Sequence, residues 1–244
     1  MKIIVPVSGG KDSTATLLLA IEQKDQRDIM ALHNNTGWDH PETYRYLEYL
    51  QIETGVEIHH TKSTTLPDLI RKYKKFPFGA GRFCTRSLKQ DAIYHWLRDL
   101  GYYSSGIAEV WFGIRSNESS QRARKYSGMS ADNLYNYRDI FVSCPKGLAK
   151  HAKVRLPILD WSSEQVFEYL ESKGIKKNPL YDEGTNDRVG CYPCLLAGKK
   201  VQEKMFATDE GKKRLDIIRQ LEKEIGKKYE MFDTDQGSCE VCKT

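Results

Sequence analysis

The sequence of 244 residues has no apolar run near the roughly 18 residues that are needed to cross a bilayer. It also shows no internal repeat, no low-complexity tract and no basic-then-apolar leader at its start. Hydrophobic residues make up 39% and charged residues 29%, which is an ordinary composition for a water-soluble protein. These absences argue against a membrane-spanning or fibrous chain, and we expect a cytoplasmic protein without a membrane partner.

The chain also has little net charge and few cysteines. The net charge is +5 and there are six cysteines. A charge of this size fits anionic small molecules as easily as nucleic acid. In a reducing cytosol, cysteines in C-x-x-C pairs favour metal or redox chemistry over a disulfide framework. The length allows one well-packed domain with an appendage, or two small domains.

Two common phosphate-binding motifs, the G-x-x-x-x-G-K-[ST] loop and the G-x-G-x-x-G fingerprint, are missing. A different turn joins the apolar run at 3–7 to a helix-like run, and its residues are Ser8, Gly9, Gly10, Lys11, Asp12 and Ser13. Free amides and the positive end of the helix dipole would face a ligand above this turn. An ordinary turn with a capping side chain is the alternative, but six consecutive residues of this chemistry favour phosphate binding.

Strand-like and helix-like segments alternate along the first half of the chain. Strands are predicted at 2–7, 29–34, 56–60 and 110–114, and helices at 12–22, 41–54, 66–74 and 86–100. This alternation predicts an α/β fold with a doubly wound parallel sheet. An irregular lid is predicted at 117–154, and helices at 162–173 and 208–227. We therefore predict a nucleotide-binding domain at 1–154 and a helical, cysteine-rich module at 155–244.

Polar groups follow several predicted strands at the edge where doubly wound sheets bind ligands. Thr36 and Gly37 follow the second strand, and Arg115 and Glu118 follow the fourth. Arg115 and Arg122 offer two guanidinium groups for a sulfate, a phosphate or a nucleic-acid backbone, the alternative being solvated surface arginines. Glu118 could anchor these arginines or a metal-bound water.

Further side chains beside this edge have two interpretations each. Lys89 either serves a ligand or is a solvent-facing helix charge. Tyr181 and Tyr192 either stack on a base or pack in the interior.

Four cysteines form two C-x-x-C pairs, Cys191 with Cys194 and Cys239 with Cys242, separated by 44 residues. Two such pairs supply four thiolates, which suits a tetrahedral metal site. The alternative is an unmetallated redox dithiol near the end of the chain. Cys144 has no partner at such a spacing, and we expect it to be a buried small side chain.

Several motifs together resemble the phosphoadenosine phosphosulfate (PAPS) reductase family of adenine nucleotide α-hydrolase folds. They are the six-residue turn, Asn35-Thr36-Gly37 with Pro41-Glu42-Thr43, Phe83 to Lys89, Gly113 to Arg122, Pro157 to Trp161, and Asn178 to Cys194. The resemblance covers residues 2 to 198. It implies a Rossmann-like fold and a PP-loop that holds the β- and γ-phosphates of ATP, with Mg²⁺ held in part by Asp12. It also implies Lys11, Asp12, Arg115 and Arg122 as catalytic residues.

The resemblance offers a second arrangement for the cysteines. Iron–sulfur members of the family ligate a [4Fe–4S] cluster with residues that correspond to Cys84, Cys191 and Cys194, and Cys239 or Cys242 would supply the fourth ligand here. Those members carry adjacent cysteines at the first position, where this chain has Phe83. The choice between zinc and iron–sulfur stays open.

The family contains both sulfonucleotide reductases and enzymes that use ATP. Reductases carry a degenerate PP-loop and a C-terminal Glu-Cys-Gly-Leu-His signature, whereas this chain has an intact loop and ends Ser238-Cys-Glu-Val-Cys-Lys-Thr244. We therefore expect an ATP pyrophosphatase that adenylates an acceptor in sulfur metabolism, resembling the branch of DNA-phosphorothioation proteins and ATP sulfurylase. The alternatives are a reductase that uses Cys239 or Cys242 with thioredoxin, and a non-catalytic binding module. A sulfur-donor protein and a nucleic-acid acceptor are candidate partners, and the acceptor and oligomeric state stay open.

Overall fold

The computed structural model describes residues 2–61, 64–78, 81–102, 108–184 and 188–226. Its centre is a six-stranded sheet in the order β3-β2-β1-β4-β6-β5. The strands are β1 (Ile3–Pro6), β2 (Ile29–His33), β3 (Ile58–His60), β4 (Ala108–Trp111), β5 (Tyr135–Asn136) and β6 (Ala152–Arg155). All neighbours pair in parallel except β5, which runs antiparallel to β6 at the edge.

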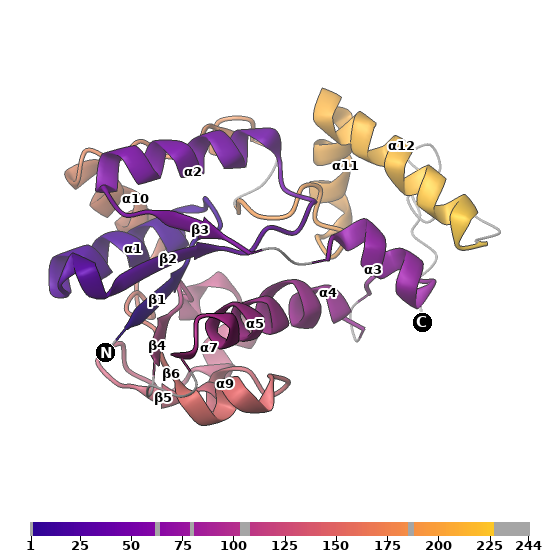
Figure 1. The fold of residues 1–244 in the computed structure, drawn as a ribbon. Coiled ribbons are helices and arrows are strands. Elements are labelled where there is room, and N and C mark those ends of the chain that lie inside the picture. Colours follow the sequence, from indigo (N-terminus) through magenta and orange to yellow (C-terminus); the bar gives the residue numbers. More distant parts are fainter. Residues whose placement is uncertain (1, 62–63, 79–80, 103–107, 185–187, 227–244) are drawn as a thin grey trace.

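Helices cover both faces of the sheet (Figure 1). One face carries α1 (Lys11–Gln23), α2 (Pro41–Thr54) and α10 (Ser163–Ser172), and the other carries α5 (Asp91–Asp99), α7 (Ser120–Lys125), α8 (Tyr137–Ile140) and α9 (Lys146–His151). Successive β1 residues divide between these layers, because side chains alternate along a strand. Val5 packs with the first layer and Ile4 with the second, and both are fully buried. The structure is thus the predicted α/β fold, with helices on both sides.

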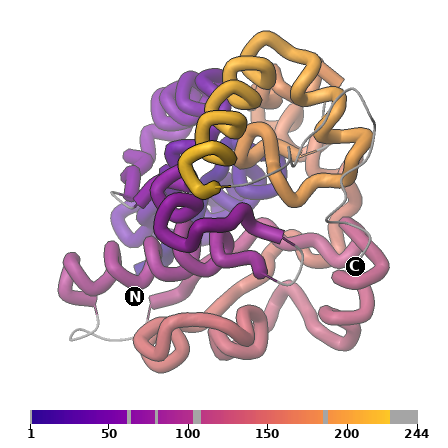
Figure 2. The backbone as a smooth tube through the Cα atoms, turned by 90° about the vertical axis from the view of Figure 1, so that its right-hand side faces the viewer, coloured from indigo at the N-terminus to yellow at the C-terminus, as the bar shows by residue number. Residues whose placement is uncertain are grey.

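A third group of helices packs beside the sheet rather than on it (Figure 2). It contains α3 (Leu66–Tyr73), α4 (Phe83–Thr85), α11 (Lys199–Ala207) and α12 (Asp209–Glu224), around buried residues such as Trp38, Ile70 and Leu221. Trp38 connects this cluster to the chain near Cys191: its Nε1 donates to the Pro193 carbonyl at 3.0 Å, and its carbonyl accepts from the Tyr192 amide at 2.7 Å. Residues Tyr192 and Pro193 are therefore joined to the loop that follows β2.

Short elements complete the chain: η1 (Gln26–Asp28), the π-helical turn η2 (Arg86–Gln90), η3 (Ser116–Glu118) and η4 (Pro179–Tyr181). None of the helices in the described ranges is long and apolar enough to cross a membrane. The irregular lid expected at 117–154 was wrong, because this segment contains β5, β6 and three short helices. Alternation of buried Ala152 and Val154 with half-buried Lys153 was the sign of a strand. The predicted boundary at residue 155 meets the end of β6, and the division into two domains stays a prediction.

Candidate nucleotide site at the carboxyl edge of the sheet

The turn after β1 leads directly into α1, as the sequence predicts. Gly9 has a φ of 74°, which a residue with a side chain rarely adopts. Gly10 is the N-cap residue of α1, so the first amides of the helix receive no capping side chain from that position. Ser13 stiffens the turn: its Oγ accepts from the Ser8 amide at 3.1 Å and donates to the Gly10 carbonyl at 2.9 Å. The turn is thus held in a shape that presents the start of a helix to an anion.

Lys11 is buried, with 3% of its surface exposed. Its Nζ lies 5.4 Å from the ring centroid of Phe167 on α10 and 5.2 Å from that of Tyr181 in η4. The same Nζ is 4.0 Å from an Asp12 oxygen. Aromatic faces and a carboxylate together stabilise a buried cation. The Lys11 Nζ is therefore held in the interior, beside the first turn of α1.

The Tyr181 hydroxyl accepts a hydrogen bond at 2.8 Å from the Lys11 N–H, which is the first amide of α1. Burial raises the pKa of Tyr181 to about 12, so the group is a neutral hydroxyl at pH 7. A Cβ on Gly10 would lie 3.4 Å from this hydroxyl and 3.1 Å from the Val189 carbonyl. Tyr181 and Val189 thus cover the turn, and the tyrosine oxygen accepts from an amide that a phosphate oxygen could also use.

Arg115 reaches the same turn from the end of β4. Its Nε donates to Asp12 Oδ1 at 2.6 Å, and the arginine is 5% exposed. The approach depends on Gly113, where a Cβ would come within 2.5 Å of the Asp12 carbonyl. The structure therefore brings the two predicted residues together. The Asp12 carboxylate already faces Arg115 and Lys11, so in this arrangement it does not fit the predicted role of a magnesium ligand.

A second arginine group lies beside the first. Glu118 forms ion pairs with Arg122 on α7 and with Arg188, whose Nε is 3.1 Å from Glu118 Oε1. Burial lowers the pKa of Arg122, and the neighbouring charges of Arg188 and Arg115 act in the same direction. Like charges held together in this way are relieved by a bound anion. Arg188 was not predicted, and the sequence signal for it was a basic residue two positions before Gly190-Cys191.

Thr36 and Gly37 shape the turn after β2, and their contact with a ligand stays a prediction. Thr36 is 2% exposed, and its hydroxyl donates to Asp39 Oδ2 at 2.7 Å. Gly37 has a φ of 63°, and a Cβ there would come within 2.6 Å of Thr65. Asp39 Oδ2 also lies 3.8 Å from His33 Nε2. Burial opposes ionisation of Asp39, but His33 and Thr36 outweigh it and hold its pKa below the ordinary value.

Three of the described cysteines interact electrostatically with Lys89: Cys191 most strongly, then Cys194 and Cys84, and together they raise the pKa of the lysine. Cys191 Sγ is 3.8 Å from the Thr36 hydroxyl, and burial raises the pKa of this thiol to about 12. Lys89 thus interacts with the cysteine group, and its contact with a nucleotide stays a prediction.

No three His, Cys, Asp or Glu side chains within the described ranges are arranged to hold a metal ion. The three described cysteines of the predicted sites, Cys84, Cys191 and Cys194, therefore do not form a ligand set by themselves. Cys239 and Cys242 lie outside the described residues. The predicted metal or iron–sulfur site stays a prediction, and we assign it no chemical step. Cys144 is buried, as expected.

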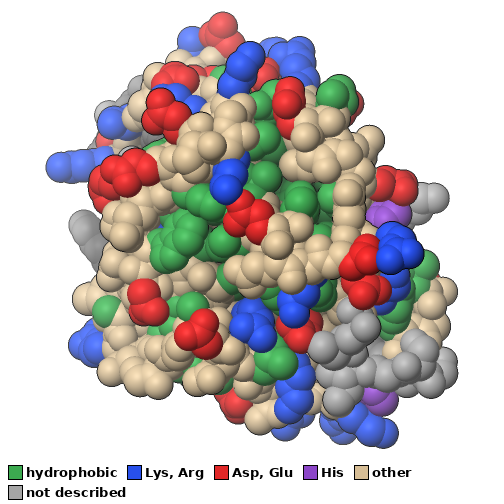
Figure 3. Space-filling view, turned by 90° about the vertical axis from the view of Figure 1, so that its left-hand side faces the viewer, with side chains coloured by type: hydrophobic (Ala, Val, Ile, Leu, Met, Phe, Trp, Pro, Cys, Tyr) green, Lys and Arg blue, Asp and Glu red, His purple; other side chains and the backbone are tan. Residues whose placement is uncertain are grey.

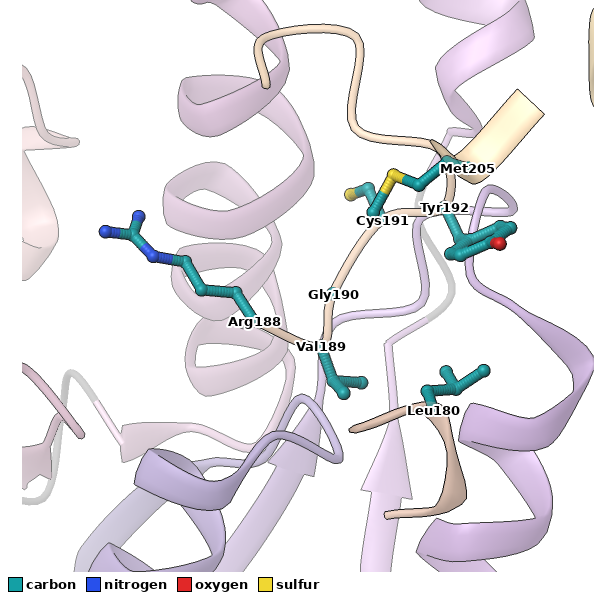
Figure 4. A pocket seen from close by; sticks show the side chains of 7 residues that line it. All are labelled: Leu180, Arg188, Val189, Gly190, Cys191, Tyr192 and Met205. Carbon is teal, nitrogen blue, oxygen red and sulfur yellow. The ribbon is translucent and has the colours of Figure 1, made fainter. Parts of the chain in front are cut away.

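A small hollow lies between the arginine group and the cysteines (Figure 4). Its volume is about 10 Å³, room for a single water molecule, so it does not hold a nucleotide as it stands. In Figure 4 the Arg188 side chain extends to one side of this segment while Val189 and Tyr192 point to the other. The lining residues are Leu180, Arg188, Val189, Gly190, Cys191, Tyr192 and Met205. Residues 188–192 thus run from the arginine group to Cys191.

The chain is similar both to uncharacterised proteins and to proteins named as reductases. The chain is 30% identical over 256 aligned residues to an uncharacterised 37.8 kDa protein of Escherichia phage 186, covering 84% of this chain and 70% of that protein. It is 28% identical to an uncharacterised protein of Methanocaldococcus jannaschii, and it spans only 36% of that protein's length. It is 26% identical to the phosphoadenosine 5'-phosphosulfate reductase of Buchnera aphidicola, over 74% of this chain and 66% of the reductase.

The fold has a counterpart among solved structures. The phosphate complex of the PAPS reductase from Candida auris superimposes with a TM-score of 0.52 over 80% of this chain and 83% of that one, at 14% identity. The family model for the phosphoadenosine phosphosulfate reductase domain matches residues 2–197, most of the chain. The resemblance inferred from the motifs is confirmed, and the chain belongs to the phosphoadenosine phosphosulfate reductase family.

Proposed function

We propose that the chain is an ATP pyrophosphatase of this family, which cleaves ATP at the α-phosphate and adenylates an acceptor. The observation that carries the proposal is the intact turn after β1, with buried Lys11 beside the start of α1, where the N-cap residue Gly10 offers no side chain. A site of this kind is built for a chain of phosphates. A ligand that lacks β- and γ-phosphates would offer no phosphate for Lys11 and the first amides of α1 to bind.

The position of each residue in the site gives it a different role in ATP cleavage. Lys11 and the α1 amides hold the β- and γ-phosphates and neutralise the charge that grows on the leaving pyrophosphate. Asp12 orients Arg115, and the guanidinium groups of Arg115, Arg122 and Arg188 stabilise the α-phosphate as it is attacked. An acceptor oxygen bonds to the α-phosphorus, the bond to the bridging oxygen breaks, and pyrophosphate leaves with its electron pair. Mg²⁺ would enter with ATP as part of the substrate.

The alternative is a sulfonucleotide reductase, and two observations favour it. Relatives named as PAPS reductases match 70% or more of this chain, and Cys84, Cys191 and Cys194 interact electrostatically with one lysine. Sulfite release from PAPS in the presence of thioredoxin, without ATP, would identify that activity. Pyrophosphate release from ATP identifies the first one.

The test is pyrophosphate release from ATP with Mg²⁺ by the wild type and by Lys11→Ala. Loss of a charge that stabilises the leaving group lowers kcat by about 10²–10³. Lys24→Ala is the matched control, because Lys24 is an exposed lysine at the far end of the same helix. Equal rates for the wild type and Lys11→Ala would overturn the role of the turn. A wild type that releases sulfite from PAPS, but no pyrophosphate from ATP in a screen of sulfate, thiols and nucleic acids as acceptors, would overturn the proposal.

A further inference from the structure

One continuous stretch of the chain is strongly basic. From residue 71 to residue 90, seven side chains are Lys or Arg and none is Asp or Glu, although the whole chain has a net charge of only +5. The cations are Arg71, Lys72, Lys74, Lys75, Arg82, Arg86 and Lys89. On the face of the molecule shown in Figure 3, by contrast, acidic and basic side chains are interspersed. The basic stretch is therefore a local concentration of charge that the overall composition conceals.

Exposed aromatic rings lie among these cations. Tyr73 and Phe78 are each 41% exposed. Phe76, 2% exposed, anchors the segment in the cluster between α3 and α12. The Phe78 ring lies against Gly81, where a Cβ would come within 2.7 Å of it. Tyr73 is supported from the side by Phe83, at 4.8 Å between ring centroids. Both rings are held in place while part of each faces solvent.

Lysine ammonium groups accompany both rings. Lys72 Nζ lies 5.6 Å from the Tyr73 ring centroid, and Lys75 Nζ lies 5.7 Å from that of Phe78. The neighbouring Arg71 differs, because it is paired with Glu224 at 2.7 Å and with Asp68 at 3.5 Å. Lys72, Tyr73, Lys74, Lys75 and Phe78, all exposed, form what we call the basic–aromatic surface.

The position of the basic–aromatic surface relates it to the cysteine group. Tyr73 ends α3 and contacts Phe83, which directly precedes Cys84. Phe83, Cys84 and Cys191 pack against one apolar cluster. A polymer lying across α3 and α4 would therefore pass beside Cys84 and Lys89, whereas a small metabolite would need no such extended surface.

We propose that the basic–aromatic surface binds single-stranded nucleic acid. Cations track the phosphates of a strand, and exposed rings stack on its unpaired bases. A duplex conceals its base faces, so the two rings favour a single strand over a duplex. The proposal concerns binding and does not rest on ATP cleavage.

The test is fluorescence anisotropy with a labelled 20-nucleotide mixed-sequence strand, as RNA and as DNA, and with the DNA duplex, all without ATP. The wild type should bind at least one of the single strands tighter than the duplex. Lys72→Glu/Lys75→Glu should weaken binding at least tenfold, and the slope of log K against log salt should become shallower by about 1.4, which is about 0.7 for each lost phosphate contact. Tyr73→Ala and Phe78→Ala should each weaken binding about fivefold or more with the salt slope unchanged.

Lys199→Glu/Lys200→Glu is the control, because it makes the same change of net charge on exposed residues at the start of α11. Circular dichroism and thermal unfolding verify that each variant folds. No binding of either single strand by the wild type, equal binding of single strands and duplex, or an equal loss in the two double variants would each overturn the proposal. Because no arm contains ATP, failure of the proposed ATP chemistry would leave these results unaffected.

Discussion

Replacing Tyr181 with Phe should destabilise the free protein, in which Tyr181 covers the turn after β1 (residues 8–13), without destabilising the complex with ATP. In the structure the Tyr181 hydroxyl accepts from the Lys11 amide at 2.8 Å, a position that a phosphate oxygen would take in the complex. The hydroxyl bond then stabilises only the free protein. A hydrogen bond of this kind is worth about 0.5–1.5 kcal/mol net. Its loss should raise the free energy of the free protein and leave the complex unchanged.

Tyr181→Phe should therefore bind ATP about twofold to tenfold more tightly, while the free energy of unfolding of the free protein falls by the matching amount. Isothermal titration with a non-hydrolysable ATP analogue gives the affinity, and urea unfolding gives the stability. Tyr169→Phe is the control, because the Tyr169 hydroxyl donates to Glu22 at 2.9 Å on the outer side of the same region. That variant should lose stability without a change in affinity. Weaker or unchanged ATP binding by Tyr181→Phe would refute the reasoning.

Three further predictions follow from the geometry. Gly113→Ala should lower pyrophosphate release at least tenfold, because its Cβ would come within 2.5 Å of the Asp12 carbonyl and displace Arg115; an unchanged kcat would contradict this. Arg188→Gln should raise the KM for ATP several-fold and leave the thermal midpoint within a few degrees, since this arginine is exposed at the site; an unchanged KM would exclude it from binding. Asp39 has a folded pKa below its ordinary value of 3.8, so its stabilisation is present above that pH and is lost as the pH falls through the lower folded value. Urea unfolding from pH 7 to pH 3 should accordingly show Asp39→Asn less stable than wild type at neutral pH, with the difference shrinking below pH 4; a constant difference would contradict the assignment.

Much of the fold follows from local pattern. The strands and helices around β1, α1, β2 and α2 lie close to their predicted ranges, because alternating and helical periodicity is a property of neighbouring residues. The sequence did not predict β6 or α11, because these short segments have weak local patterns and gain their stability from packing. The paired cysteines show another limit: their spacing predicts a metal site that stays a prediction, but it carried no sign of the interaction between Cys191 and Lys89.

The sequence by itself determined the phosphate turn, because strand, glycine turn, lysine and helix start are contiguous and need no distant partner. It also determined the family, because the motifs occur in order along the chain. Only the tertiary structure decided what surrounds the turn. Tyr181 and Arg188 reach their partners across segments that no periodicity connects. Such contacts arise where sheet order and loop packing bring distant residues together, and a linear pattern carries no record of them.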